Sequence, residues 1–341
     1  MSHIGTARLI HGRSLIAGLG ARFSRRGFTH IQIGEALCAE ANNTMGLLDA
    51  QLTRALIHTF EGNSLATKSV SDRCEELARR GGLYGSPLLM LVRDLVVAAD
   101  YFSGDFRSVL SRTEGYLADA KDRGTIIECV QPLLMKGLAH LALNELDAAK
   151  QCIAEANAIC AKTPLMLVQH RLELMQTELL LYEGKHEEGL RALDEIEARR
   201  RSLGVFPSKI ETSFAALQRW RFFLIKKNNT SWPRASYWGL YSAADSAPVT
   251  LRSSAYRVEA SLYARQNNPR MALKRLEDAL FLSEQNRNDV TTATTYAARA
   301  AVKRRFKLHG AEFDQEVAEA MFARLGLTEC YFFRAEGWDL L

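Results

Sequence analysis

The chain has 341 residues, of which 47% are hydrophobic and 24% are charged, with a formal net charge of +5. This composition is that of a soluble folded protein and excludes intrinsic disorder, while the mild positive charge permits an acidic partner without requiring one. The longest apolar runs, such as Leu88–Val92, are broken by charged residues, so no run approaches the roughly 18 apolar residues of a membrane span, and no secretory signal pattern is present.

The six cysteines form no C-x-x-C pair and mostly lie within apolar helical patterns, as Cys152 and Cys160 do. We therefore expect buried free thiols in a reducing compartment. Together with the absence of targeting and membrane patterns, this predicts a cytoplasmic protein.

Apolar residues recur at intervals of three and four nearly throughout, which predicts amphipathic helices, and alternating strand patterns are almost absent. Pro132 lies inside one expected helix and indicates either a later helix start or a kink near Gln131. In chain order, the expected pairs are Ile4–Phe23 with Phe28–Ala41, Thr44–Glu61 with Ser64–Arg80, Pro87–Ser103 with Phe106–Lys121, Thr125–Leu143 with Leu146–Cys160, Gln169–Glu183 with Glu187–Arg201, Lys209–Lys227 with Thr230–Thr250, Leu251–Gln266 with Pro269–Asn286, and Val290–Leu308 with Ala311–Leu325.

Each expected pair has a Gly or Asn at its turn, and these residues enter the left-handed conformation most easily. The eight turn residues are Gly27, Gly62, Gly104, Asn144, Gly184, Asn228, Asn267 and Gly310. A repeat of about 40 residues built from paired helices is typical of an α-solenoid.

Small residues at the expected helix crossings resemble those of tetratricopeptide repeats. They lie seven before, five after and twelve after the turn residue: Gly137, Ala149 and Ala156 around Asn144, and Ala260, Ala272 and Ala279 around Asn267. The pairs at Gly184 and Gly62 match in part, and those at Gly104 and Asn228 depart from the pattern. The period exceeds the usual 34 residues and also fits HEAT-like repeats, which remain the structural rival.

The long helices resemble the C-terminal arrays of bacterial MalT-like regulators and STAND signalling ATPases. This resemblance implies an all-α fold, a right-handed solenoid of about eight antiparallel hairpins without a sheet. The single domain 1–341 would comprise an N-terminal hairpin (1–43), regular repeats (44–208), an irregular aromatic-rich hairpin (209–250) and C-terminal repeats with a cap (251–341).

The irregular hairpin gathers aromatic residues on both sides of its turn, among them Trp220, Phe222, Trp232 and Trp238. Two interpretations stay open: the rings fill the junction of a distorted hairpin, or they form a binding pocket or a dimer patch.

The tetratricopeptide resemblance places the first helix of each pair along a concave groove. The candidate partner-binding residues, from that groove and from the aromatic patch, are Asp94, Tyr101, Gln131, Arg171, Glu178, Gln218, Phe222, Arg257, Trp232 and Trp238. Arg171 and Arg257 could each grip a carboxylate through paired N–H donors, or they could bridge to neighbouring acidic side chains.

Motifs of catalysis are missing from the sequence. It contains no G-x-x-x-x-G-K-[ST] phosphate loop, no H-E-x-x-H and no G-x-S-x-G. We therefore expect no enzymatic activity in this chain, and no catalytic, cofactor-binding or metal-binding residues.

Three functions remain as hypotheses. The leading one is a non-catalytic scaffold or sensor module that binds a protein or peptide. The second is a regulatory fragment of a larger signalling ATPase or kinase; the apolar face of the first hairpin (Ile4, Leu9, Ile10, Leu15, Ile16) suggests a homodimer or a covalently linked preceding domain. The third is a nucleic-acid-binding solenoid, for which basic clusters such as Arg199–Arg201 and Lys303–Lys307 would supply charge, although their place near helix ends favours solvated, dipole-matched residues.

Overall fold

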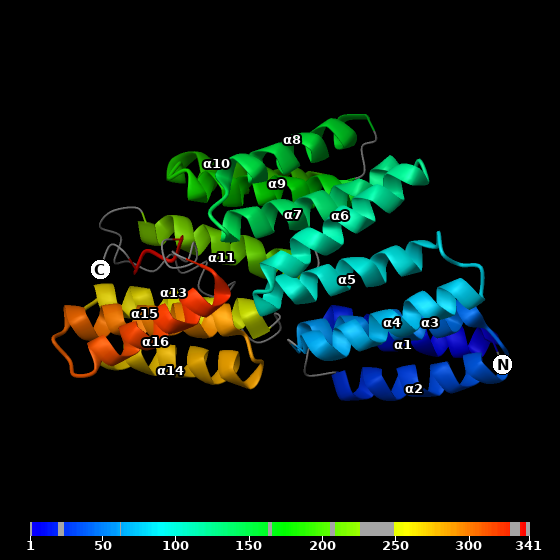
Figure 1. The fold of residues 1–341 in the computed structure, drawn as a ribbon, viewed down its shortest axis with the longest axis horizontal. Coiled ribbons are helices and arrows are strands. Elements are labelled where there is room, and N and C mark those ends of the chain that lie inside the picture. Colours follow the sequence, from blue (N-terminus) through cyan, green and yellow to red (C-terminus); the bar gives the residue numbers. More distant parts are fainter. Residues whose placement is uncertain are drawn as a thin grey trace.

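A computed structural model describes residues 2–19, 24–61, 63–162, 166–204, 209–225, 249–327 and 335–338, and this part of the chain contains α-helices and no strand (Figure 1). The first helices of the hairpins are α1 (Ser2–Leu19), α3 (Thr44–Phe60), α5 (Pro87–Ser103), α7 (Val130–Ala142), α9 (Met166–Tyr182), α11 (Lys209–Ile225), α13 (Val249–Arg265) and α15 (Asp289–Arg305). The second helices are α2 (Ser24–Glu40), α4 (Ser64–Arg80), α6 (Phe106–Asp122), α8 (Leu146–Lys162), α10 (His186–Ser202), α14 (Pro269–Gln285) and α16 (Ala311–Leu325). The second stretch of the aromatic hairpin, with Trp232 and Trp238, lies outside the described residues.

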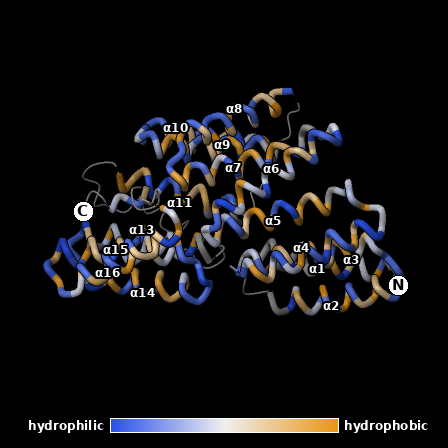
Figure 2. Tube along the Cα trace, viewed as in Figure 1, coloured by the Kyte–Doolittle hydropathy of each residue, from blue (hydrophilic) through white to orange (hydrophobic). Residues whose placement is uncertain are grey.

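The helices pack in chain order as antiparallel hairpins, so the predicted all-α solenoid is confirmed. Hydrophobic and hydrophilic residues are interspersed along the helices (Figure 2). Pro132 lies in the first turn of α7, directly after a short 3-10 helix (Ile126–Cys129), so the later helix start is correct. No helix in the described ranges is long and apolar enough to cross a membrane.

Left-handed residues end the first helices where the sequence predicts them. Gly104, Asn144, Gly184 and Asn267 follow their first helices with positive φ angles between 57° and 82°. After α15 the first left-handed residue is Lys307, and the predicted Gly310, with a φ of 78°, caps the start of α16. Gly62 and Asn228 lie outside the described residues.

The prediction that Gly27 is a turn residue is wrong, because α2 already begins at Ser24 and Gly27 lies in its first turn. A Cβ on Gly12 of α1 would lie 2.8 Å from the carbonyl oxygen of Gly27. Gly27 therefore allows α1 and α2 to cross closely, and the chain does not reverse its direction there.

A second set of left-handed residues joins one hairpin to the next. It comprises Asn42, Gly82, Gly124, Gly204 and Arg287, and the left-handed Gly326 ends the last described hairpin. None of these positions is among the eight predicted turn residues, and Arg287 carries no sequence signal for a left-handed φ of 50°.

Hydrogen bonds between side chains show the stacking register directly. Arg171 of α9 donates from Nε to Glu211 of α11 at 3.0 Å and from Nη1 to Gln131 of α7 at 3.2 Å, and each partner is 40 residues away. Glu178 of α9 and Gln218 of α11, also 40 residues apart, are joined at 2.7 Å. Equivalent positions of successive repeats thus lie side by side on the first helices.

The two halves of the solenoid meet where the α5–α6 turn contacts the start of α15 (Figure 1). The Asn288 side chain donates a hydrogen bond to the carbonyl oxygen of Phe102, 186 residues earlier. Val290 and Leu327 pack with Val97 and other residues of α5, α6 and α7 in one core cluster. The array therefore curls until its C-terminal repeats rest on its third hairpin.

Buried ion pairs join neighbouring hairpins elsewhere. Arg93 of α5, which is 4% exposed, donates to Glu75 of α4 at 2.7 Å and to Asp119 of α6 at 2.6 Å. All five cysteines in the described part are buried and free, as predicted, and burial raises the pKa of the Cys74 thiol to about 12.

Candidate inner-face site

The first helices α5 to α15 carry a row of polar side chains along one side, which we call the inner face. It contains most of the candidate residues: Asp94 and Tyr101 on α5, Gln131 on α7, Arg171 and Glu178 on α9, Gln218 on α11 and Arg257 on α13. The row is continuous because equivalent positions stack at the 40-residue repeat. Sequence reasoning therefore selected residues that the fold does bring together.

The part of the inner face around Asp94, Gln131 and Arg171, which we call its upper part, is charged and half-buried. Arg171 is held between Gln131 and Glu211, as the bridging interpretation predicted, yet its side chain stays 40% exposed. Burial raises the pKa of Asp94 to about 7; the positive charge of Arg171 opposes this shift and the negative charge of Glu128 adds to it. Asp94 can therefore change its charge near neutral pH.

The middle of the inner face is a buried hydrogen-bond chain between α9 and α11. Gln218 accepts a hydrogen bond from Thr177 at 2.8 Å and donates to the carbonyl oxygen of Leu174 at 2.9 Å as well as to Glu178. The second oxygen of Glu178 accepts from Arg221 at 3.0 Å. Gln218 and Glu178 are 0% and 2% exposed, so these groups are satisfied inside the protein and do not face solvent.

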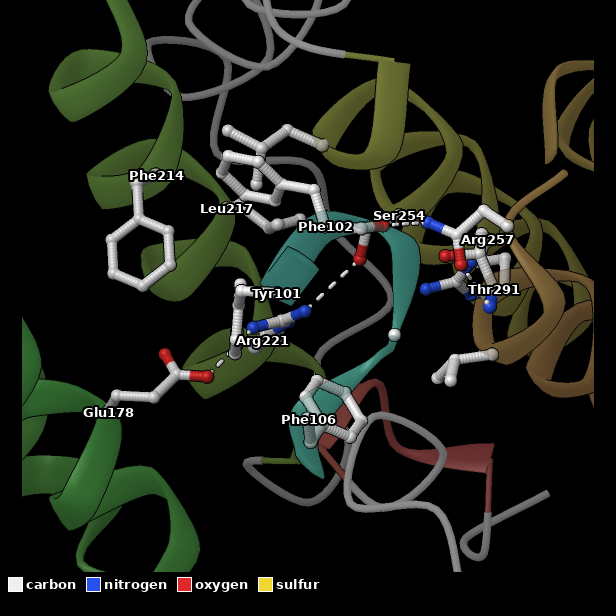
Figure 3. Close-up of a pocket in the computed structure, with 14 residues that line it drawn as sticks. Tyr101, Phe102, Phe106, Glu178, Phe214, Leu217, Arg221, Ser254, Arg257 and Thr291 are labelled. Carbon is white, nitrogen blue, oxygen red and sulfur yellow. Dashed lines mark hydrogen bonds and ion pairs between the residues drawn. The ribbon is translucent and has the colours of Figure 1, made fainter. Parts of the chain in front are cut away.

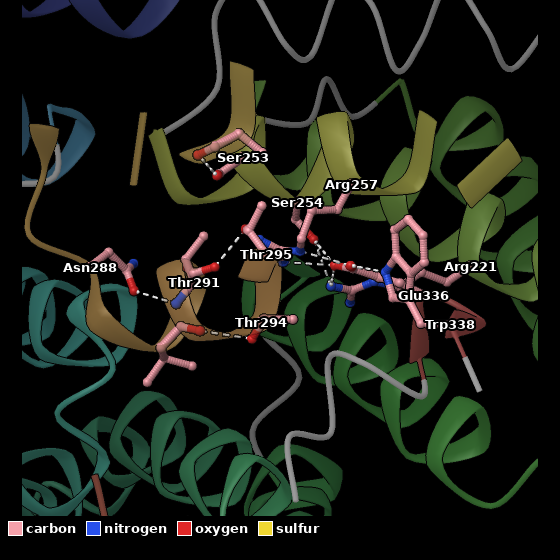
Figure 4. Close-up of polar contacts among 12 residues, drawn as sticks. Arg221, Ser253, Ser254, Arg257, Asn288, Thr291, Thr294, Thr295, Glu336 and Trp338 are labelled. Carbon is pink, nitrogen blue, oxygen red and sulfur yellow. Dashed lines mark hydrogen bonds and ion pairs between the residues drawn. The ribbon is translucent and has the colours of Figure 1, made fainter. Parts of the chain in front are cut away.

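At the lower end, two arginines hold a carboxylate that comes from the far end of the chain (Figure 4). Arg257 binds Glu336 in the bidentate manner, with Nε and Nη2 each 2.8 Å from one carboxylate oxygen. Ser254 donates to Glu336 at 2.5 Å, and Arg221 lies 3.7 Å from the same oxygen. Burial alone would raise the pKa of Glu336, but the charges and hydrogen bonds of Arg257, Arg221 and Ser254 hold it below its usual value.

The residues around Glu336 continue this contact across three helices. Ala335 packs in the core cluster that includes Leu174 of α9 and Phe222 of α11. Trp338, which is 2% exposed, packs in a core cluster with residues of α13, α14 and α15 and donates from its indole nitrogen to Glu336 at 3.1 Å. The segment 335–338, which we call the C-terminal plug, thus lies across the faces of α9, α11, α13 and α15.

Gly337 gives the plug its shape. Its φ of 71° is left-handed, and a Cβ at this position would come within 2.6 Å of the Arg265 guanidinium, which donates to the Gly337 carbonyl oxygen at 3.1 Å. Glycine is the residue that combines a left-handed φ with such a close approach. The turn at Gly337 brings the carboxylate and the indole to the same site.

Beside the plug, a cavity of about 40 Å³ opens between Arg221, Arg257 and the α5–α6 turn (Figure 3). Tyr101 and Phe102 line it from α5, and Thr291 lines it from α15. A volume of this size holds a few water molecules and no peptide. Beside the plug, the space between these helices is therefore largely filled by the protein itself.

The aromatic candidates divide between two places. Trp220 is 1% exposed and packs with Leu217 and Leu224, and Phe222 is fully buried against Gly189 of the preceding hairpin. Both rings are core residues, as the first interpretation held, and Phe222 lies beneath the inner face and not on an open groove. Trp232 and Trp238 lie outside the described residues.

Sequence reasoning missed the three residues that complete the site, Arg221, Ser254 and Glu336. Arg221 stands at a small-residue position of the hairpin that departs from the repeat pattern, and that departure was its only signal. Glu336 belongs to a Glu-Gly-Trp triplet 79 residues beyond its partner Arg257, so only the curvature of the array brings them together.

Each of the two basic clusters includes a residue that pairs with an acidic neighbour. Arg199 pairs with Glu173 at 2.5 Å, and Lys303 pairs with Asp314 at 2.7 Å. Such pairs favour the interpretation of solvated helix ends over that of a nucleic-acid surface.

Neither protein-family models nor curated proteins match this chain. Fold and site together define a class: an all-α solenoid of helical hairpins whose first helices form a polar, buried inner face.

Proposed function

We propose that this chain is a non-catalytic recognition scaffold, resembling a tetratricopeptide array, that binds a protein or peptide segment on its inner face. One observation supports this most strongly: the inner face already holds a peptide segment of the same chain by its carboxylate, backbone and aromatic ring. A charge-assisted bidentate grip and an apolar contact for a ring are the elements by which helical arrays recognise segments.

The charge balance of the lower site also supports the proposal. Arg221 and Arg257 are 2% exposed, and Glu178 and Glu336 balance them. Without Glu336 the buried charges no longer cancel, and an uncompensated buried charge is costly. Any segment that takes the place of the plug must therefore bring an acidic group.

Arg171 offers a second contact point, because it is the half-exposed cation of the upper inner face. A scaffold or sensor role inside a larger bacterial, cytoplasmic signalling protein fits the resemblance to MalT-like arrays and is part of the same proposal.

The test is a selection of peptides from a random display library on the immobilised full chain, followed by hydrogen exchange of the complexes. We expect new protection on α7, α9, α11 and α13, and at least a fivefold loss of affinity in Arg171→Gln. The matched control is Arg191→Gln on the exposed side of α10, which we expect to bind as the wild type does. Protection confined to the second helices, or equal losses in both variants, would contradict the proposal.

A further inference from the structure

The C-terminal plug contacts the inner face as a bound ligand would. The helices that it contacts lie far from it in the sequence. Its described residues contact α9 and α11 through Ala335, α13 through Glu336 and Gly337, and α13 and α15 through Trp338. The partners of Glu336 lie 79 and 82 residues earlier in the chain. These contacts therefore join a short segment near the C-terminus to helices that lie far from it in the sequence.

The receptor side of these contacts is built for one chemical pattern. Arg257 supplies two parallel N–H donors with planar geometry, which matches the two oxygens of a carboxylate. The core cluster that includes the Trp338 ring contains Ala260, Ala264 and Ala298, whose small side chains leave room for a large ring. The Arg265 guanidinium donates a hydrogen bond to the Gly337 carbonyl oxygen, and only a residue without a Cβ lets this left-handed turn come so close.

We propose that this site recognises a Glu-Gly-aromatic turn in a partner protein, and that the C-terminal plug is an intramolecular competitor that keeps the site closed. The inference rests on the proposed function of the inner face and specifies its ligand. Binding of the partner segment exchanges one carboxylate for another on Arg257, so the buried charges stay balanced at the end of the exchange.

The covalent attachment of the plug sets the strength of the competition. A tethered segment has an effective concentration on the order of millimolar, so it competes with a free peptide as a millimolar ligand would. For a free peptide with an intrinsic Kd of about 10 µM, the closed wild-type chain is then expected to bind about 100-fold more weakly than a chain whose plug cannot dock.

The experiment uses the full chain and a fluorescent peptide with the sequence of residues 333–341. Wild type is compared with Glu336→Gln/Trp338→Ala, in which the plug loses its carboxylate and its indole. We expect the double variant to bind the peptide at least tenfold more tightly than the wild type does. Peptides carrying Glu336→Gln or Gly337→Ala in the same sequence are expected to lose at least tenfold in affinity for the double variant.

A second full-length variant, Gly337→Ala, guards against misfolding, because it changes neither charge nor ring and disturbs the turn of the plug and its contact with Arg265. It is expected to bind the peptide more tightly than the wild type does, with an unchanged far-ultraviolet circular dichroism spectrum. Equal binding by all three chains, or no binding to either variant when both are folded, would overturn the inference.

The two proposals fail in different ways. If the 333–341 peptide does not bind but display-selected peptides protect the first helices, the inner face remains a binding surface and the plug is only a structural cap. If the peptide binds as expected but the display selection yields no inner-face binder, the site serves the chain's own segment alone and the proposed scaffold function fails.

Discussion

Removing the carboxylate of Glu336 tests the energetic argument for the inner-face site. In Glu336→Ala, Arg257 loses both of its carboxylate bonds and retains one long bond of 3.4 Å to Thr295, while its side chain stays 3% exposed. Breaking a buried ion pair by deleting one partner typically costs about 3–5 kcal/mol, because the remaining charge is left uncompensated. We expect a loss in this range for the stability of the C-terminal repeats.

The double variant Arg257→Met/Glu336→Ala separates this charge effect from lost packing. It removes both charges, so we expect it to be more stable than Glu336→Ala, with a coupling energy of at least about 2 kcal/mol in the mutant cycle. Glu319→Ala on the exposed side of α16 is the control and should change stability by less than about 0.5 kcal/mol.

Native-state hydrogen exchange is the suitable assay, because each repeat of a solenoid contacts mainly its neighbours and can open locally. The free energy of opening is read from amides of α13 and α15. The charge argument is refuted by two results together. Glu336→Ala would lower the free energy of opening of α13 and α15 by less than about 1 kcal/mol, and Arg257→Met would lower it equally in the wild type and in Glu336→Ala.

Three further predictions concern the fold and its pH dependence. Gly104→Ala should destabilise by about 1–3 kcal/mol in thermal or urea unfolding, because residue 104 is left-handed and its new Cβ would overlap Val290; adding Val290→Ala should restore part of this loss. Gly189→Ala should lower the free energy of unfolding by about 1–3 kcal/mol, because its Cβ would overlap the Phe222 ring. Gly115→Ala on α6 should raise it by about 0.5–1 kcal/mol, because the space around its Cβ is open. Asp94→Asn should raise stability by about 1–2 kcal/mol above pH 7, after allowance for partial exposure, and should have little effect below pH 4.

The sign of the last prediction follows from the raised pKa of Asp94. Between its ordinary value near 3.8 and its folded value of about 7, the folded chain retains a proton that the unfolded chain has lost. The contribution of Asp94 to the free energy of unfolding therefore falls as the pH rises through that window, and it is constant above it. A wild-type and Asp94→Asn pair with parallel stability curves from pH 4 to pH 7 would contradict the assignment.

The glycine predictions have outcomes that would count against the packing described above. A Val290→Ala change that fails to improve Gly104→Ala would show that the third hairpin and α15 do not touch in solution. Equal effects of Gly189→Ala and Gly115→Ala would show that the hairpins are not closely packed at the small-residue positions.

Much of the fold could be predicted from local patterns because solenoid contacts are local. The 40-residue recurrence of Gly and Asn marked the hairpin turns, and five of those residues are left-handed as expected. The turn at Gly27 was predicted wrongly because a glycine that permits close helix crossing looks the same in sequence as one that ends a helix. The left-handed Arg287 carries no local signal of its conformation.

The site could be predicted only on its receptor side. Arg171 and Arg257 follow from the repeat positions of the first helices, and both are paired with carboxylates. Their partners differ in kind: Glu211 is a stacked neighbour one repeat away, whereas Glu336 depends on the curvature of the whole array. Curvature accumulates over many hairpins and is not encoded in any one of them.

Recognition of a peptide segment by the inner face is tested most directly by photo-crosslinking. The 333–341 peptide, with benzophenylalanine in place of Trp338, is crosslinked to the full-length Glu336→Gln/Trp338→Ala chain. Trp338 belongs to a core cluster with Ala260 and Ala264 of α13, Ala272 and Leu276 of α14, and Ala298 and Val302 of α15, so crosslinks are expected on these three helices and should decrease when unlabelled peptide competes. Crosslinks spread over other helices, or insensitive to that competitor, would contradict an inner face that recognises a peptide segment.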